Sequence, residues 1–272
     1  TKQIYEAVVW QMNWMAESPF PSNIFVFTMW NYFHLLYNNK GQLNEMINVE
    51  QLQLLCRFFE DDYEIDLNTS DNEQSPLNPL FAIFTFLFTI DHSRDDAFLS
   101  NLYQSLLESF SFRRLINLTS SENINYSVKA FEVLKQILVK HPELTQNLLS
   151  LDLLDALAAG MENHFSIKEH CYETIIALIQ TQLGDIVLHI FQSNLLLLVL
   201  DFVSTLDVNG CRRFLFIFKF SLELISNSEL ISTITALLVQ NERFEQLEEI
   251  FEDQDDNLIM PIKQQLGLLE TE

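Results

Sequence analysis

Apolar residues recur at the three- and four-residue spacing of an α-helix along almost the whole chain. In the first such segment, 3–16, they are Ile4, Ala7, Val8, Met12 and Met15, and a Pro-containing break follows. Further runs predict helices at 22–37, 43–49, 51–59, 78–90, 99–107, 112–118, 128–138, 144–149, 151–158, 166–179, 185–191, 194–206, 214–224 and 230–239. Glycine (5) and proline (6) are scarce, which disfavours many short strands joined by turns. The pattern therefore predicts an all-α protein.

The helical pattern repeats itself within the chain. Ser166-Ile167-Lys168-Glu169 echoes Ser127-Val128-Lys129-Ala130, and the segment 149–154 is echoed 42 residues later by 191–196. Each copy reads as a short, a medium and a long helix. A period of about 40 residues made only of helical patterns is typical of an α-solenoid. Long third helices are predicted to begin near 22, 78, 126, 166 and 209.

Local signals add detail to this prediction. Ser166 with Glu169, and Ser226 with Glu229, have the spacing of a capping box at a helix start. Gly41 is expected to close the second helix in a left-handed conformation. The helix at 78–90 has almost no polar face and is expected to be buried nearly all round. The Phe-rich helix over 214–220 is predicted to be either covered core or an exposed docking face.

Two strongly acidic segments interrupt the helices. Residues 60–73 contain seven acids and no base, which predicts a solvated acidic loop insertion over 60–76. Residues 242–256 contain eight acids and one base, which suits an acidic C-terminal cap over 242–272. The whole chain, 1–272, is predicted to be one continuous helical repeat domain. Because the chain begins with Thr1 in a helical pattern, we expect it to be a processed or excised piece of a longer protein.

The net charge of −23, from 38 acids and 15 bases, argues against a nucleic-acid-binding protein and against an anionic membrane surface. It favours a basic protein partner, or serves only to keep a Phe-rich solenoid in solution. The three cysteines are scattered, which fits buried thiols in a reducing compartment. No apolar stretch reaches the length of about 20 residues that a membrane span requires. These features predict a cytoplasmic location, with the nucleus as the alternative.

No motif predicts catalysis, a cofactor or a metal. Residues 62–73 place oxygen ligands at calcium-loop spacing, but Leu67 occupies the position where the turn needs glycine. His170 and Cys171 are adjacent on a helix and therefore point about 100° apart, which disfavours a shared zinc ion. Because no nucleophile or phosphate-binding motif appears, we expect a non-enzymatic protein. A site that the sequence does not reveal remains the alternative.

The succession of short, medium and long helices resembles the armadillo repeat family, and two-helix HEAT repeats are the nearest rival. The resemblance implies a right-handed α-solenoid of about four to six repeats, whose third helices line a concave groove that holds an extended partner segment. Met29-Trp30-Asn31-Tyr32 resembles the end of the family's third helix, and 134–137 carries Gln136 there. The groove residues implied by this resemblance are Trp30, Asn31, His34, Lys135 and Gln136.

The resemblance implies a non-enzymatic scaffold or adaptor that binds a basic or extended segment of a partner protein. A nuclear-transport-type adaptor for basic signal peptides is the alternative. The charge of −23 favours that alternative. The missing regular Trp and Asn ladder argues against it, since the third helices at 166–179 and 209–224 lack an amide at the expected place.

Overall fold

The computed structural model describes residues 2–17, 22–60, 75, 77–90, 97–181, 190, 194–225, 228–240 and 258–268. Every regular element within these ranges is a helix, which confirms the predicted all-α class. The chain divides into two compact units, residues 1–141 and 142–272. The expectation of one continuous domain over 1–272 stays a prediction.

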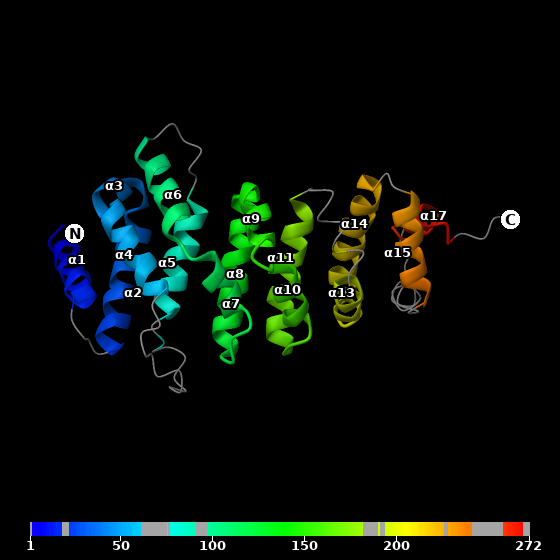
Figure 1. The fold of residues 1–272 in the computed structure, drawn as a ribbon, viewed down its shortest axis with the longest axis horizontal. Coiled ribbons are helices and arrows are strands. Elements are labelled where there is room, and N and C mark those ends of the chain that lie inside the picture. Colours follow the sequence, from blue (N-terminus) through cyan, green and yellow to red (C-terminus); the bar gives the residue numbers. More distant parts are fainter. Residues whose placement is uncertain are drawn as a thin grey trace. The chain divides into compact units, whose positions relative to one another are not determined.

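The first unit places its long helices next to one another. Helix α5 contacts α2 on one side and α8 on the other, and α4 packs against α6 (Figure 1). The bounds in this unit are α1 (Lys2–Glu17), α2 (Ser22–Asn38), the 3₁₀ turn η1 (Lys40–Gln42), α3 (Leu43–Met46), α4 (Val49–Glu60), α5 (Leu77–Thr89), α6 (Ala97–Ser109), α7 (Phe112–Leu118) and α8 (Ile124–Lys140).

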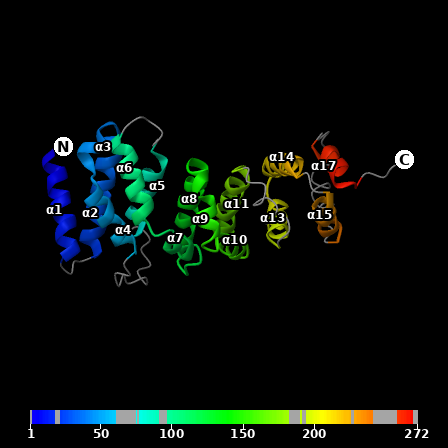
Figure 2. The same cartoon turned by 45° about the horizontal axis from the view of Figure 1, so that its top comes forward.

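The second unit shows the succession of short, medium and long helices directly, with α9, α10 and α11 in that order. Helix α10 packs against α11 and α13, and α11 contacts α14 (Figure 2). The bounds are η3 (Pro142–Leu144), α9 (Thr145–Leu149), α10 (Leu153–Met161), α11 (Phe165–Gln180), α13 (Leu195–Val203), α14 (Val208–Leu224), α15 (Ser228–Gln240) and α17 (Ile259–Leu266).

One burial pattern recurs in four long helices and fixes the register of the repeat. In α8 the buried positions include Ala130, Phe131, Val133, Leu134, Ile137 and Leu138. The same positions are buried 41 residues later in α11, from Cys171 to Ile179, and again 43 residues after that in α14, from Phe214 to Leu222. Helix α5 has the pattern 50 residues before α8, from Leu80 to Phe88. This recurrence confirms a fold made of helical repeats.

The starts of the long helices agree with the sequence prediction. They begin at Ser22, Leu77, Ile124, Phe165 and Val208, within two residues of the predicted positions. The first turn of α5 contains Pro79, whose missing N–H costs nothing there because the first amides of a helix have no acceptor within it. Helix α8 ends at Lys140 and is followed by His141-Pro142, as predicted.

Two predicted local signals are wrong. The Ser166 capping box is not formed, because α11 begins at Phe165 and has His164 as its N-cap, without a side-chain capping bond. Gly41 is not a left-handed cap, because it lies inside η1. Among the described residues, positive φ occurs at Asp152 and at Gly267, which ends α17. The Ser226 box, most of the predicted helix over 185–191 and most of both acidic segments lie outside the described residues.

The Phe-rich helix α14 divides its rings between core and surface. Phe214 and Phe218 are buried and stack with ring centroids 5.6 Å apart. Phe216 and Phe220 are 63% and 43% exposed. The core reading is therefore confirmed for Phe214 and Phe218, and a docking role for the exposed face stays a prediction.

A capping interaction at the start of α14 yields a first prediction. Asp207 has extended backbone geometry, and its Oδ1 accepts a hydrogen bond from the Gly210 N–H at 2.8 Å. We expect Asp207→Ala to lower the free energy of unfolding by about 1 kcal/mol, since the helix loses this cap. Urea unfolding monitored by circular dichroism measures the change. Asp207→Asn is the control, because Asn also caps helices well, and an equal loss in both variants would contradict a capping role.

Candidate functional site

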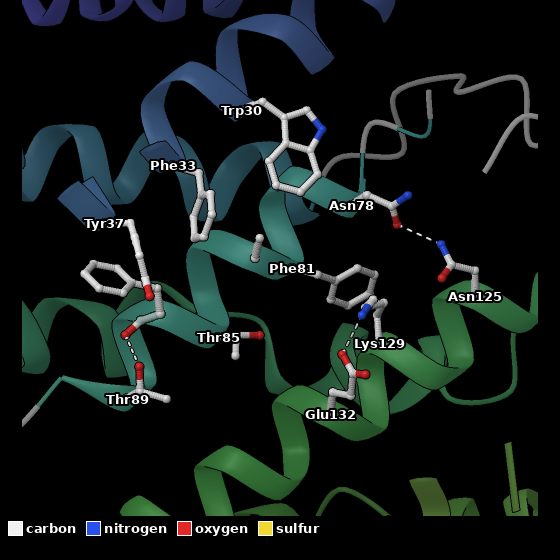
Figure 3. A pocket seen from close by; sticks show the side chains of 12 residues that line it. Trp30, Phe33, Tyr37, Asn78, Phe81, Thr85, Thr89, Asn125, Lys129 and Glu132 are labelled. Atoms are coloured by element: carbon white, nitrogen blue, oxygen red, sulfur yellow. Dashed lines mark hydrogen bonds and ion pairs between the residues drawn. The ribbon is translucent and has the colours of Figure 1, made fainter. Parts of the chain in front are cut away.

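A hollow of about 830 Å³ lies across three helices of the first unit that begin where long third helices were predicted (Figure 3). It runs from α2 over α5 to α8, and all of its lining residues belong to these helices. The lining consists of Trp30, Phe33, Tyr37, Asn78, Phe81, Ala82, Thr85, Phe86, Thr89, Asn125, Lys129 and Glu132. We call this hollow the groove.

Aromatic side chains form the wall of the groove on the α2 side. The Trp30 and Phe33 rings meet edge to face with centroids 5.7 Å apart, and Phe33 and Tyr37 lie 5.8 Å apart. Tyr37 in turn contacts Phe86 of α5 at 5.9 Å. Trp30 and Phe33 are half-buried and Tyr37 is exposed, so this wall offers ring surface that the protein itself does not cover. Such surface suits apolar and planar groups of a partner.

The floor of the groove is the open face of α5. Ala82 and Thr85 are half-buried, and Thr89 is exposed. The expectation that this helix is buried nearly all round is therefore wrong for one face. Bulky residues outside the lining, including Phe84 and Phe88, are fully buried beneath the floor. Small side chains on the remaining face leave the space that α2 and α8 border.

Polar side chains form the wall on the α8 side. The Asn125 amide donates a hydrogen bond to Asn78 Oδ1 at 2.9 Å and so joins the starts of α8 and α5. One turn further along α8, Lys129 Nζ lies 2.7 Å from Glu132 Oε2. This pair is more than one-third exposed, so it contributes little to stability. Both charges in the lining are therefore already paired with each other.

One of the five residues implied by the armadillo resemblance lines the groove, namely Trp30. Asn31 donates its amide to the Phe27 carbonyl oxygen of its own helix at 2.9 Å. His34 is exposed, with its ring 6.2 Å from that of Trp30. Lys135 and Gln136 are half-buried on α8 and, like Asn31 and His34, are not among the lining residues. A binding role for these four residues stays a prediction.

Sequence reasoning missed the amides that do lie in the groove, Asn78 and Asn125. Both precede the positions at which the family pattern places an asparagine, because they belong to the first turns of their helices. The available signal was the small-residue stripe Ala82, Thr85 and Thr89, spaced three and four residues apart in an otherwise bulky helix.

A second, smaller hollow of about 440 Å³ lies in the second unit. Phe165 and Lys168 at the start of α11 face Asp201 and Phe202 of α13 across it. The two rings lie 5.6 Å apart. Its lining mixes two acids with one base and is less aromatic than the groove.

The cysteines and histidines considered for a metal site have structural contacts. Cys171 is buried and donates its thiol to the Leu157 carbonyl oxygen at 3.1 Å. His170 Nδ1 lies 2.8 Å from the Ser166 carbonyl oxygen. Across the ranges that the structure describes, no cluster of three metal-ligating side chains occurs. The calcium-like segment 62–73 lies outside them. In the same ranges no helix has the length and apolar character needed to cross a membrane.

Comparisons with known proteins identify the fold rather than a family. No protein family matches the sequence, and no curated protein matches it either. An engineered protein solved by the Northeast Structural Genomics Consortium (target OR329) superposes with a TM-score of 0.56 at 8% identity, covering 96% of this chain and 97% of that one. A second engineered protein (target OR366) gives 0.55 at 11% identity, with 97% and 96% covered.

A computationally designed armadillo repeat protein for modular peptide recognition aligns over 98% of both chains, with a TM-score of 0.49 and 12% identity. At such identities a likeness concerns the fold alone. The repeated helix order and burial register define the class of this protein, which is an armadillo-like α-solenoid.

Proposed function

We propose that this protein is a non-enzymatic scaffold that binds a segment of a partner protein in the groove of its first unit. The observation that carries the proposal is a continuous hollow over three successive long helices, with exposed rings on one wall and amides on the other. Solenoids use surfaces of this kind for extended partners, because their repeats leave a long continuous face. The amide side chains of the groove are suited to hydrogen bonds with the main chain of a partner segment, and the aromatic rings are suited to packing against its side chains.

Several further features support this assignment. The groove lining contains no histidine, cysteine or serine, and its Lys129 and Glu132 are paired with each other. All three cysteines are free and buried, which agrees with a reducing compartment such as the cytoplasm. The alternative, a nuclear-transport-type adaptor for basic signals, is supported by the net charge of −23. However, the one carboxylate of the groove lining, Glu132, is already paired with Lys129. The groove itself thus favours the general scaffold.

Site-specific crosslinking tests the proposal. A photo-crosslinking amino acid at Tyr37, an exposed aromatic position of the groove wall, is compared with one at Asn101, which is exposed on α6 and does not line the groove. We expect a partner segment from the source organism to be crosslinked from Tyr37 but not from Asn101. Mass spectrometry of the crosslinked peptide then defines the bound segment. Equal crosslinking from both positions would overturn the proposal.

Trp30 provides the matching substitution. We expect Trp30→Ala to weaken binding of that segment by about 2 kcal/mol, or roughly 30-fold, because a tryptophan at the edge of a binding hollow commonly dominates the affinity. Phe27→Ala is the control, since Phe27 is exposed on the same helix and does not line the groove. Titration of both variants by calorimetry measures the difference. Unchanged affinity in folded Trp30→Ala protein would contradict binding in the groove.

A further inference from the structure

One position on the groove floor departs from the repeat. In the shared burial register, Ala82 of α5 corresponds to Glu132 of α8, 50 residues later. Glu132 corresponds in turn to Glu173 of α11, a further 41 residues later. A single methyl group therefore stands at the position that a long acidic side chain occupies in the next two third helices. The small side chains Ala82 and Thr85 therefore leave the groove floor open at this position.

The borders of this space are apolar on one side and electrically neutral on the other. Trp30, Phe33 and Tyr37 present partly exposed rings toward it (Figure 3). Lys129 and Glu132 neutralise each other at 2.7 Å on the opposite wall. A charged side chain entering here would give up water without finding an unpaired opposite charge in the lining. An uncharged apolar side chain would instead cover ring surface, which is favourable.

We infer that the groove selects a partner segment by one large uncharged apolar side chain, of the Leu, Met, Phe or Trp class, seated over Ala82 and Thr85. The inference rests on the proposed function, which it makes more specific. The net charge of −23 belongs to the whole protein, whereas the anchor position of the groove selects a partner side chain by its apolar volume.

A displayed library of short random peptides, selected on the full chain, tests this inference. We expect the recovered peptides to share one large apolar residue and to show no enrichment of Lys or Arg. A synthetic peptide with this residue changed to Ala or Lys should lose at least about tenfold in affinity. Affinity should change less than about threefold between low and high salt, since no net ion pair forms at the anchor.

Two substitutions fill the anchor space without touching the buried face of α5. Ala82→Leu should reduce affinity at least about tenfold, and Thr85→Leu serves as a second variant if the first does not fold. Leu is a good helix former, so the helix itself tolerates both changes. Asn101→Leu is the matched control, because Asn101 is exposed on α6 and does not line the groove, and this variant should bind normally. Circular dichroism verifies that each variant is folded.

Fluorescence anisotropy of a dye-labelled peptide gives the readout. The label is on the peptide, so binding can be measured in every variant, including Trp30→Ala. Basic peptides that bind with a steep salt dependence and are lost in Trp30→Ala would overturn the inference but leave the proposed function standing. Peptides that bind Trp30→Ala and Ala82→Leu as well as the original chain would refute both. A selection that recovers no peptide would also count against both.

Discussion

Replacing Phe110 by Ala is expected to lower the free energy of unfolding of the first unit by about 3–5 kcal/mol, as for other fully enclosed phenylalanines. Phe110 is only 5% exposed and follows the last turn of α6. Its ring centroid lies 4.8–5.2 Å from those of Phe59, Phe84, Phe88 and Phe112. One side chain thus connects α4, α5 and α7. Removing it leaves a cavity that four rings from three helices cannot all close.

Urea unfolding of the full chain, followed by circular dichroism, measures the loss. The control is Phe27→Ala, because Phe27 has the same side chain in the same unit but is 68% exposed on α2. This control should change the free energy of unfolding by less than about 0.5 kcal/mol. A loss below about 1 kcal/mol for Phe110→Ala would show that the aromatic cluster does not hold these helices together.

The positions of the helices could be predicted because their causes are local. Apolar spacing and a break such as His141-Pro142 are visible in any short window, and the long helices begin within two residues of the predicted positions. The capping box at Ser166 failed because the competing start lies only one residue away, at Phe165. Helix ends depend on such small energy differences, whereas the existence of a helix depends on the whole apolar face.

The groove could not be predicted in the same way, because its cause is not local. Helix α5 has so many bulky apolar residues that the sequence suggests complete burial. Its open face becomes visible only when α2 and α8 are placed on both sides of it. Likewise, Asn78 and Asn125 are 47 residues apart and meet at 2.9 Å only in the folded chain. Trp30 was found because it lies in the family pattern, and it does line the groove.

Stability is expected to fall in mildly alkaline solution because of buried thiols. Burial raises the pKa of Cys56 to about 12, with a smaller contribution from the nearby carboxylate of Glu60. Burial also raises the pKa of Cys171. In the unfolded chain a cysteine has an ordinary pKa of about 8.5. Below that pH both states keep the proton, and the thiols add no pH dependence.

Above about pH 8.5 the unfolded chain releases these protons while the folded chain retains them, so rising pH favours unfolding. Each buried thiol should lower the free energy of unfolding by about 1.4 kcal/mol per pH unit, or about 2 kcal/mol by pH 10. Urea unfolding at a series of pH values measures this slope. In Cys56→Ala the slope of the first unit should become shallower, although the variant is less stable near neutrality. An unchanged slope in Cys56→Ala would show that this thiol ionises as readily in the folded protein as in the unfolded chain.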